Sequence, residues 1–141
     1  MKNRLLFIAL VFTSYSTLAQ NVSLKKDTIL SGKKAYAIFK KNNSTPSRYF
    51  IYSLAGKELM EIHYGHINEK EKPLYIITFS NDHKQAMIGK QPGFPKSLIL
   101  EIVKYNLIDN GLAINDRSEL QFIKAHSLPD GYTDLDQLIE Y

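Results

Sequence analysis

The chain has 141 residues, of which 44% are hydrophobic and 11% aromatic, a formal net charge of +4, and no cysteine. This composition excludes a disordered or low-complexity protein. The absence of cysteine excludes disulfides, thiolate catalysis, thiolate metal sites and a cysteine-linked lipid anchor.

The first 19 residues have the three-part pattern of a secretory signal peptide. Lys2 and Arg4 form a positive start, residues 5–12 are an unbroken apolar run, and small residues stand at Thr17 and Ala19. The alternative is an uncleaved membrane anchor, but the run is far shorter than the roughly 20 residues that span a bilayer. We therefore expect cleavage after Ala19 and export to the periplasm or the medium.

Charge is unevenly distributed over residues 20–141, a length that suits one domain. Loss of the two basic residues of the signal peptide lowers the formal net charge from +4 to +2. Residues 20–57 hold eight basic side chains and one acidic one, whereas residues 101–141 hold eight acidic and three basic ones. This segregation fits attraction between the two halves, presentation to partners, or ordinary solvated surface charge.

Residues 22–90 have the alternating pattern of β-strands interrupted by turn signals. Two-residue loops at Ser31-Gly32 and Ala55-Gly56 favour hairpins, because glycine tolerates the positive φ of tight turns. Consecutive hairpins of this kind predict an antiparallel β-meander of about six strands. We expect these strands over residues 28–30, 33–40, 48–54, 57–64, 74–80 and 84–90.

The hairpin around Ala55-Gly56 can be registered residue by residue. A two-residue loop pairs Tyr52 with Leu59, Ile51 with Met60 and Tyr49 with Ile62. Successive side chains of a strand point to opposite faces. One face is therefore expected to be a core face, made of Tyr49, Ile51, Met60, Ile62 and Tyr64.

The second face of this hairpin mixes aromatic and charged side chains. Exposed aromatic rings supply apolar contact area for a partner or a sugar, so the face suits either a partly covered sheet or a binding surface. The candidate binding residues on it are Arg48, Phe50, Tyr52, Leu59, Glu61 and His63.

Residues 95–140 predict two to three helices packed on the sheet. Apolar residues at helical spacing indicate a helix over residues 96–109 that ends at Asn110-Gly111. Asp116 and Glu119 resemble a capping box, which predicts a second helix to about His126 with Leu120, Ile123 and Phe122 buried. A third short helix is expected over residues 134–140. The expected class is α+β: one domain over residues 20–141, with its sheet over about 22–90 and its helices over about 95–140.

No motif in the chain specifies a catalytic reaction. His63 and His66 have the H-x-x-H spacing of metal ligands, but a shared ion requires Gly65 to break the strand, because residues three apart on a strand face opposite ways. Ordinary strand histidines are the alternative, and we expect no metal and no other cofactor. Paired lysines in residues 25–41 resemble a nucleic-acid surface; export and the common use of lysine at sheet edges argue against that partner.

Several short runs resemble a family of small secreted proteins from Bacteroidetes-type bacteria. The similar segments are Asp27-Thr28-Ile29, Gly32-Lys33, Tyr36-Ala37, residues 54–59 and residues 95–110. The resemblance implies an exported α+β fold and transfers no catalytic residue, since its motifs are turn glycines and apolar strand positions.

The leading hypothesis is an exported, non-enzymatic interaction module of the bacterial cell envelope that binds another envelope protein, with no transmembrane segment in the mature chain. One alternative is a binder of a small ligand or glycan that uses the aromatic sheet face. A second alternative is a small hydrolase whose site assembles from residues distant in the sequence.

Overall fold

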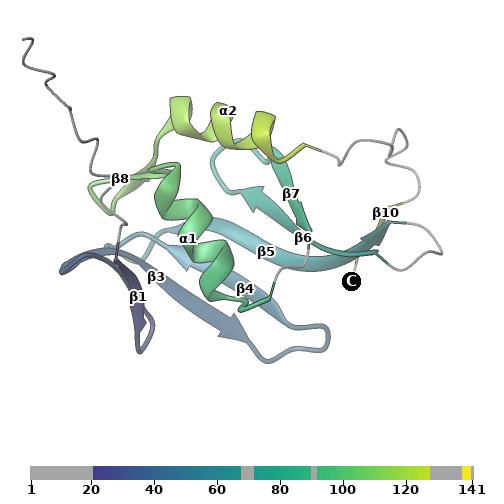
Figure 1. Ribbon diagram of the computed structural model, residues 1–141, viewed down its shortest axis with the longest axis horizontal. Coiled ribbons are helices and arrows are strands. Elements are labelled where there is room, and N and C mark those ends of the chain that lie inside the picture. Colours follow the sequence, from purple (N-terminus) through teal and green to yellow (C-terminus); the bar gives the residue numbers. More distant parts are fainter. Residues whose placement is uncertain (1–20, 68–71, 90–91, 128–137, 141) are drawn as a thin grey trace, which may run out of the picture.

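The computed structural model describes residues 21–67, 72–89, 92–127 and 138–140. Seven strands follow one another across the sheet in chain order, each antiparallel to the next (Figure 1). A further strand, β10 (Leu138–Glu140), pairs with the far end of β5. The seven are β1 (Val22–Lys25), β2 (Thr28–Ser31), β3 (Lys34–Asn42), β4 (Arg48–Tyr52), β5 (Glu58–Ile67), β6 (Lys72–Phe79) and β7 (Gln85–Gly89).

Two helices pack on one face of this sheet (Figure 1). Helix α1 (Lys96–Lys104) inserts its buried apolar side chains into the core, and α2 (Asp116–Ala125) lies beside β7. The ring of Phe122 meets those of Phe79 and Tyr105, with centroids 6.2 and 5.2 Å apart. Between the helices, β8 (Ile108–Asp109) and β9 (Ala113–Ile114) form a small hairpin. The arrangement is consistent with the α+β prediction, with seven meander strands where six were expected.

The additional strand is β1, and it escaped prediction because its turn carries no glycine. Lys26 and Asp27 connect β1 to β2, and Lys26 adopts a φ of 55°, a conformation usually given to glycine or asparagine. The next turn consists of Gly32 and Lys33 rather than Ser31 and Gly32, since Ser31 pairs with Lys34. Gly32 does have the positive φ expected of a turn glycine, at 65°.

Two bulges interrupt the alternation of the sheet. Tyr36 is an extra residue on β3, opposite the Ile29–Leu30 step of β2, and Leu59 is an extra residue on β5, opposite the Ile51–Tyr52 step of β4. An inserted residue breaks the strict alternation of faces. Tyr36 is 8% exposed and Leu59 3% exposed, and both belong to the core beneath the helices.

The bulge on β5 corrects the predicted register at one position. The pairs of Tyr49 with Ile62 and of Ile51 with Met60 are confirmed. Tyr52, however, pairs with Glu58, so the predicted pair of Tyr52 with Leu59 is wrong. The two-residue loop assumed at Ala55-Gly56 is in fact longer, because the Ser53 N–H donates to the Lys57 carbonyl oxygen at 2.7 Å.

Helix α1 ends at Lys104, five residues before its predicted end at Asp109. Asn106 has a φ of 52°, and its N–H donates to the Val103 carbonyl while the Leu107 N–H donates to the Ile102 carbonyl. These two bonds form a Schellman motif, which ends a helix at a left-handed residue. The apolar pattern continues past this point because Leu107 and Ile108 turn back into the core.

The residue that caps the start of helix α2 is one position earlier than predicted, and the face of the helix that is buried also differs from the prediction. The side chain of Asn115, not Asp116, accepts a hydrogen bond from the Ser118 N–H at 2.9 Å. Phe122 is buried, whereas Leu120 is 57% exposed, so its predicted burial is wrong. Residues two apart lie on opposite sides of a helix, and burial of the larger ring of Phe122 therefore turns Leu120 outward.

The C-terminal segment corrects the third predicted helix. Residues 138–140 pair with residues 65–67 of β5 as a strand, which satisfies backbone groups of both partners. Residues 134–137 lie outside the described residues, as do the predicted signal peptide over residues 1–19 and its cleavage position. In the part of the chain that the structure describes, no helix is long and apolar enough to cross a membrane.

Candidate functional site

Four of the six predicted binding residues lie together on the sheet face opposite the helices, called the outer face below. Arg48, Phe50 and Tyr52 alternate along β4 with the core residues of that strand, and Phe50 pairs with Glu61 of β5. Arg48 forms an ion pair with Glu61. The rings of Phe50 and Tyr52 are half-buried, with centroids 6.2 Å apart.

Lys40 completes this group, and the sequence reasoning missed it. It pairs with Phe50 across the β3–β4 ladder, and its Nζ lies 5.5 Å from the centroid of the Tyr52 ring. A cation at that distance from a ring is attracted by the ring quadrupole. The strand expected over residues 33–40 ended at this residue, whereas β3 continues to Asn42. Lys40, Arg48, Phe50, Tyr52 and Glu61 are called the aromatic patch below.

The structure does not bring the other two predicted residues to this surface. Leu59 turns into the core at the β5 bulge. His63 lies on the outer face by alternation, but it is only 7% exposed and pairs with the fully buried Ile76 of β6. Neither side chain is therefore accessible to a partner of the aromatic patch.

The strand that carries His63 and His66 is continuous. β5 runs through Gly65 to Ile67, so the strand break that a shared ion would require does not occur. Within the described ranges, no group of three or more His, Asp or Glu side chains is arranged to hold a metal ion.

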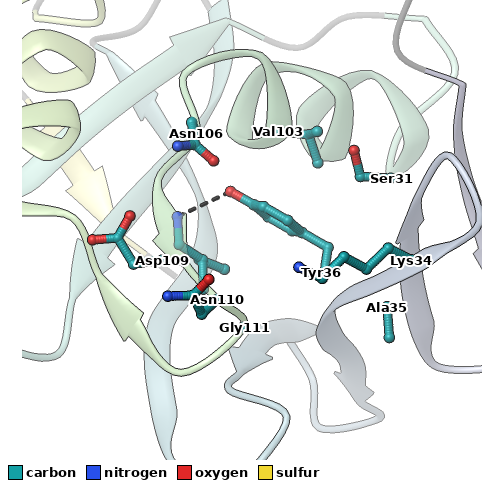
Figure 2. A pocket seen from close by; sticks show the side chains of 10 residues that line it. Ser31, Lys34, Ala35, Tyr36, Val103, Asn106, Asp109, Asn110 and Gly111 are labelled. Carbon is teal, nitrogen blue, oxygen red and sulfur yellow. Dashed lines mark hydrogen bonds between the residues drawn. The ribbon is translucent and has the colours of Figure 1, made fainter.

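A second candidate site is a cavity of about 260 Å³ on the helical side of the sheet (Figure 2). It lies where the β2–β3 hairpin, the end of α1 and the β8–β9 turn meet, and it is called the Tyr36 cavity below. The β2–β3 hairpin lies more than sixty positions before the other two segments in the chain, so no local pattern predicts the cavity. Its lining residues are Ser31, Lys34, Ala35, Tyr36, Val103, Asn106, Ile108, Asp109, Asn110 and Gly111.

The hydroxyl of Tyr36 links the segments that surround the cavity. It accepts a hydrogen bond from the Ile108 N–H at 2.9 Å (Figure 2). It also donates one to the Ile102 carbonyl oxygen at 3.5 Å. Burial raises the pKa of Tyr36 to about 12, so the hydroxyl is neutral at physiological pH. The β3 bulge is what turns this ring toward the helices, and β3 is thereby tied to α1 and β8.

The β8–β9 turn forms one wall of the cavity. Asn110 and Gly111 have φ values of 50° and 71°, and the Leu112 N–H donates to the Asp109 carbonyl at 2.9 Å, as in a type I′ turn. A Cβ on Gly111 would collide with the Leu54 side chain and lie 3.2 Å from the Tyr36 carbonyl oxygen. Glycine is therefore required there by both the backbone conformation and the close approach.

A buried carboxylate, Glu119, ties α2 to the β6–β7 turn. It is 2% exposed, and its Oε2 accepts a hydrogen bond from the Asn81 side chain at 2.9 Å. Its Oε1 has no hydrogen-bond partner among the described residues. Burial raises the pKa of Glu119, and neighbouring Asp82 raises it further, while Asn81 opposes the shift. The sequence interpretation treated Glu119 only as a helix-capping residue.

The pKa values of Asp82 and His126 are also shifted from their ordinary values. The hydrogen bond and charge of Lys84 lower the pKa of Asp82. Burial lowers the pKa of His126, although Glu101, whose Oε2 lies 3.4 Å from His126 Nε2, opposes that change. His126 also accepts, through its carbonyl oxygen, a bond from the Met87 N–H at 2.8 Å, which connects the end of α2 to β7.

Comparison of the chain with protein-family models, with curated proteins and with solved structures finds no match.

Proposed function

We propose that the mature chain is a non-enzymatic binding module that uses the aromatic patch to bind an acidic surface of another exported protein of the cell envelope. The observation that carries the proposal is the pair of half-exposed rings, Phe50 and Tyr52, held side by side on the outer face with Lys40 over one of them.

Aromatic side chains on a strand are suited to binding for an energetic reason. A large ring gives much contact area for the loss of only two side-chain torsions, and aromatic residues dominate the energy of many interfaces. Phe50 and Tyr52 stand on β4, which is paired on both sides, by β3 and β5. Little ordering of the backbone is therefore needed when a partner binds.

The charge around the rings favours an acidic partner. Glu61 is compensated by Arg48, whereas Lys40 has no ion pair with any residue that the structure describes. The surrounding segment, residues 20–57, has eight basic side chains and one acidic one. Complementary charge increases the rate of association and disfavours basic partners.

The compartment of the partner follows from the predicted signal peptide. A chain exported after cleavage at Ala19 meets proteins of the envelope or the medium, and not cytoplasmic ones. Determination of the N-terminal residue of the protein recovered from the periplasm or the medium tests this step directly, since Gln20 is the expected first residue.

The proposal is tested by capture from an envelope extract with the exported protein and a Phe50→Ser/Tyr52→Ser variant. The control variant, Leu112→Ser/Leu120→Ser, removes two exposed apolar side chains that lie outside the patch. A captured protein is identified, purified and titrated calorimetrically against all three forms at two salt concentrations.

We expect the patch variant to lose about 30-fold or more in affinity, the control to bind like the wild type, and added salt to weaken binding. Equal binding by the patch variant would contradict the proposal. Retention of only a glycan or lipid by the wild-type protein would also contradict it.

A further inference from the structure

We propose that the Tyr36 cavity is a binding site for a small, uncharged, hydroxyl-rich ligand of the size of one sugar residue. The cavity is separate from the aromatic patch, because Tyr36 points to the helical side of the sheet and the patch lies on the other side. The two proposals therefore rest on different residues and can fail independently.

The size of the cavity restricts the ligand. Sites for drug-sized molecules usually have volumes of about 300–1,000 Å³, and this cavity has about 260 Å³. It therefore suits a compact molecule rather than an extended chain or a peptide. Figure 2 shows side chains from the three segments gathered around the Tyr36 ring.

The polar groups of the lining point to hydroxyl recognition. The side chains of Ser31, Asn106 and Asn110 make no hydrogen bond to any residue in the described part of the chain, yet all three line the same cavity. A carboxamide offers both donors and an acceptor, and a serine hydroxyl does the same. A ligand hydroxyl, which also donates and accepts, can satisfy such groups, and each bond it makes replaces one to water.

The charges around the cavity favour a neutral ligand. Lys34 contributes one positive charge and Asp109 one negative charge. The carboxylate of Asp109 already accepts hydrogen bonds from the Asn115 side chain at 3.0 and 3.1 Å. The cavity also adjoins the C-terminal end of α1, which carries partial negative charge. The formal charges of Lys34 and Asp109 therefore balance, and the lining has no net formal charge that would select an anion or a cation.

The cavity is preorganised by the contacts that form it. The Tyr36 hydroxyl accepts a hydrogen bond from the Ile108 N–H, and this bond holds the ring in its position beside the cavity. Asn106 and Asn110 have φ values of 52° and 50°, a conformation that costs energy in most residues and that glycine adopts freely. Glycine would serve these two turns equally well, and what asparagine adds is an amide at the cavity.

The experiment is a titration of the isotope-labelled exported protein followed by backbone amide NMR. Three probes share one sugar ring and differ at a single substituent that sets the charge: glucose is neutral, glucose 6-phosphate carries a phosphate on the 6-oxygen, and glucosamine has an ammonium group in place of the 2-hydroxyl. Galactose, mannose and N-acetylglucosamine are added as further uncharged probes. We expect saturable shifts at residues lining the Tyr36 cavity with at least one neutral sugar, and weaker binding of the phosphate and the amine.

The variants Asn106→Gly and Asn110→Gly remove the amides but keep the left-handed backbone. Each is expected to weaken binding by about 3- to 10-fold, which corresponds to the loss of one hydrogen bond. His83→Gly is the matched control, since His83 also has a positive φ, of 61°, and does not line the cavity. Ser31→Ala provides a second test that does not alter any turn.

Three results would overturn the proposal. The first is the absence of saturable shifts with every neutral sugar up to about 50 mM, a concentration far above the dissociation constant of even a weak specific site. The second is undiminished binding by both Asn→Gly variants and by Ser31→Ala. The third is tightest binding of glucose 6-phosphate or glucosamine, which would show that charge and not hydroxyl recognition controls the cavity.

Discussion

The two faces of the sheet contain the same kinds of side chain and put them to different uses. On the helical face, Tyr75 stacks on Phe94 at 4.2 Å between centroids and Tyr49 meets the same ring at 4.7 Å, so these aromatics build core. On the outer face, Phe50 and Tyr52 stand on the same strand as Tyr49 but stay half-exposed. An aromatic residue on a strand therefore belongs to the core where helices cover its face of the sheet, and it stays available for contact with a partner where they do not.

The bulges show how one inserted residue moves a side chain between these faces. Without the extra residue on β5, alternation would place Leu59 beside Tyr52 on the outer face; with it, Leu59 lies in the core. The same device turns Tyr36 from the outer face toward α1 and β8. The difference between the two faces can thus be tested by substitutions that remove packing on one side and leave the other intact.

The largest expected effect is on the helical side, at Phe122. Phe122→Ala removes a fully buried ring that packs on Phe79 and Tyr105, and we expect a loss of about 3–5 kcal/mol in the free energy of unfolding. Leu120→Ala, on the exposed side of the same helix, should change it by about 0.5 kcal/mol or less. Urea unfolding followed by circular dichroism measures both, and a larger loss at Leu120 would contradict the assigned buried face of α2.

The next comparison sets the bulged residue Leu59 against Tyr52, the residue that it would face in a strand without a bulge. Leu59→Ala should cost about 2–4 kcal/mol, because it leaves a cavity in the core. Tyr52→Ala should cost about 1 kcal/mol or less, since its ring is partly solvated, while it weakens binding of the partner proposed for the aromatic patch. The opposite pattern, in which Leu59→Ala is neutral, would show that the β5 bulge does not bury this side chain.

A smaller effect is expected from loss of the Tyr36 hydroxyl. Tyr36→Phe keeps the ring but leaves the Ile108 N–H without its partner, which should cost about 1–3 kcal/mol. Tyr105→Phe is the control, because the Tyr105 hydroxyl makes no hydrogen bond within the described ranges. Equal stability of the two variants in thermal unfolding would show that the link from β3 to β8 contributes nothing.

The smallest effect concerns pH and the buried Glu119. Its pKa is raised in the folded state, so the folded protein holds this proton at pH values where the unfolded chain has already released it. Glu119 therefore contributes its full stabilisation at pH values below the pKa that it has in the unfolded chain. This stabilisation is lost as the pH rises through the higher pKa that it has in the folded protein.

Glu119→Gln keeps an acceptor for Asn81 and removes the titration. We expect the variant to have a higher melting temperature than the wild type near pH 7 and no advantage near pH 4. The lowered pKa of Asp82 acts with the opposite sign, since its contribution is lost as pH falls. Asp82 interacts directly with Glu119, so the difference between the two proteins reports the titration of this pair rather than of Glu119 alone. An advantage that is the same at all pH values would show that ionisation at this pair of carboxyl groups does not limit stability.

Much of the meander could be predicted because its signals are local. Alternation over residues 48–64, together with the turn at Gly56, was sufficient to pair Tyr49 with Ile62 and Ile51 with Met60. Arg48, Phe50, Tyr52 and Glu61 were assigned to one face by the same alternation, and the ion pair of Arg48 with Glu61 joins two of them. Lys40 was missed because the pairing of β3 with β4 spans a polar loop that hides the end of the strand.

The amino-acid sequence by itself determined the antiparallel hairpins, the start of both helices to within a residue, and the face on which Phe50 and Tyr52 lie. Short-range sterics and side-chain periodicity control these features, and both are contained in neighbouring residues. Tertiary structure alone decided the burial of Leu59, the early end of α1, the outward turn of Leu120 and the existence of the Tyr36 cavity. Each depends on packing between segments far apart in the chain, where the shape of the space to be filled selects which residue goes inside.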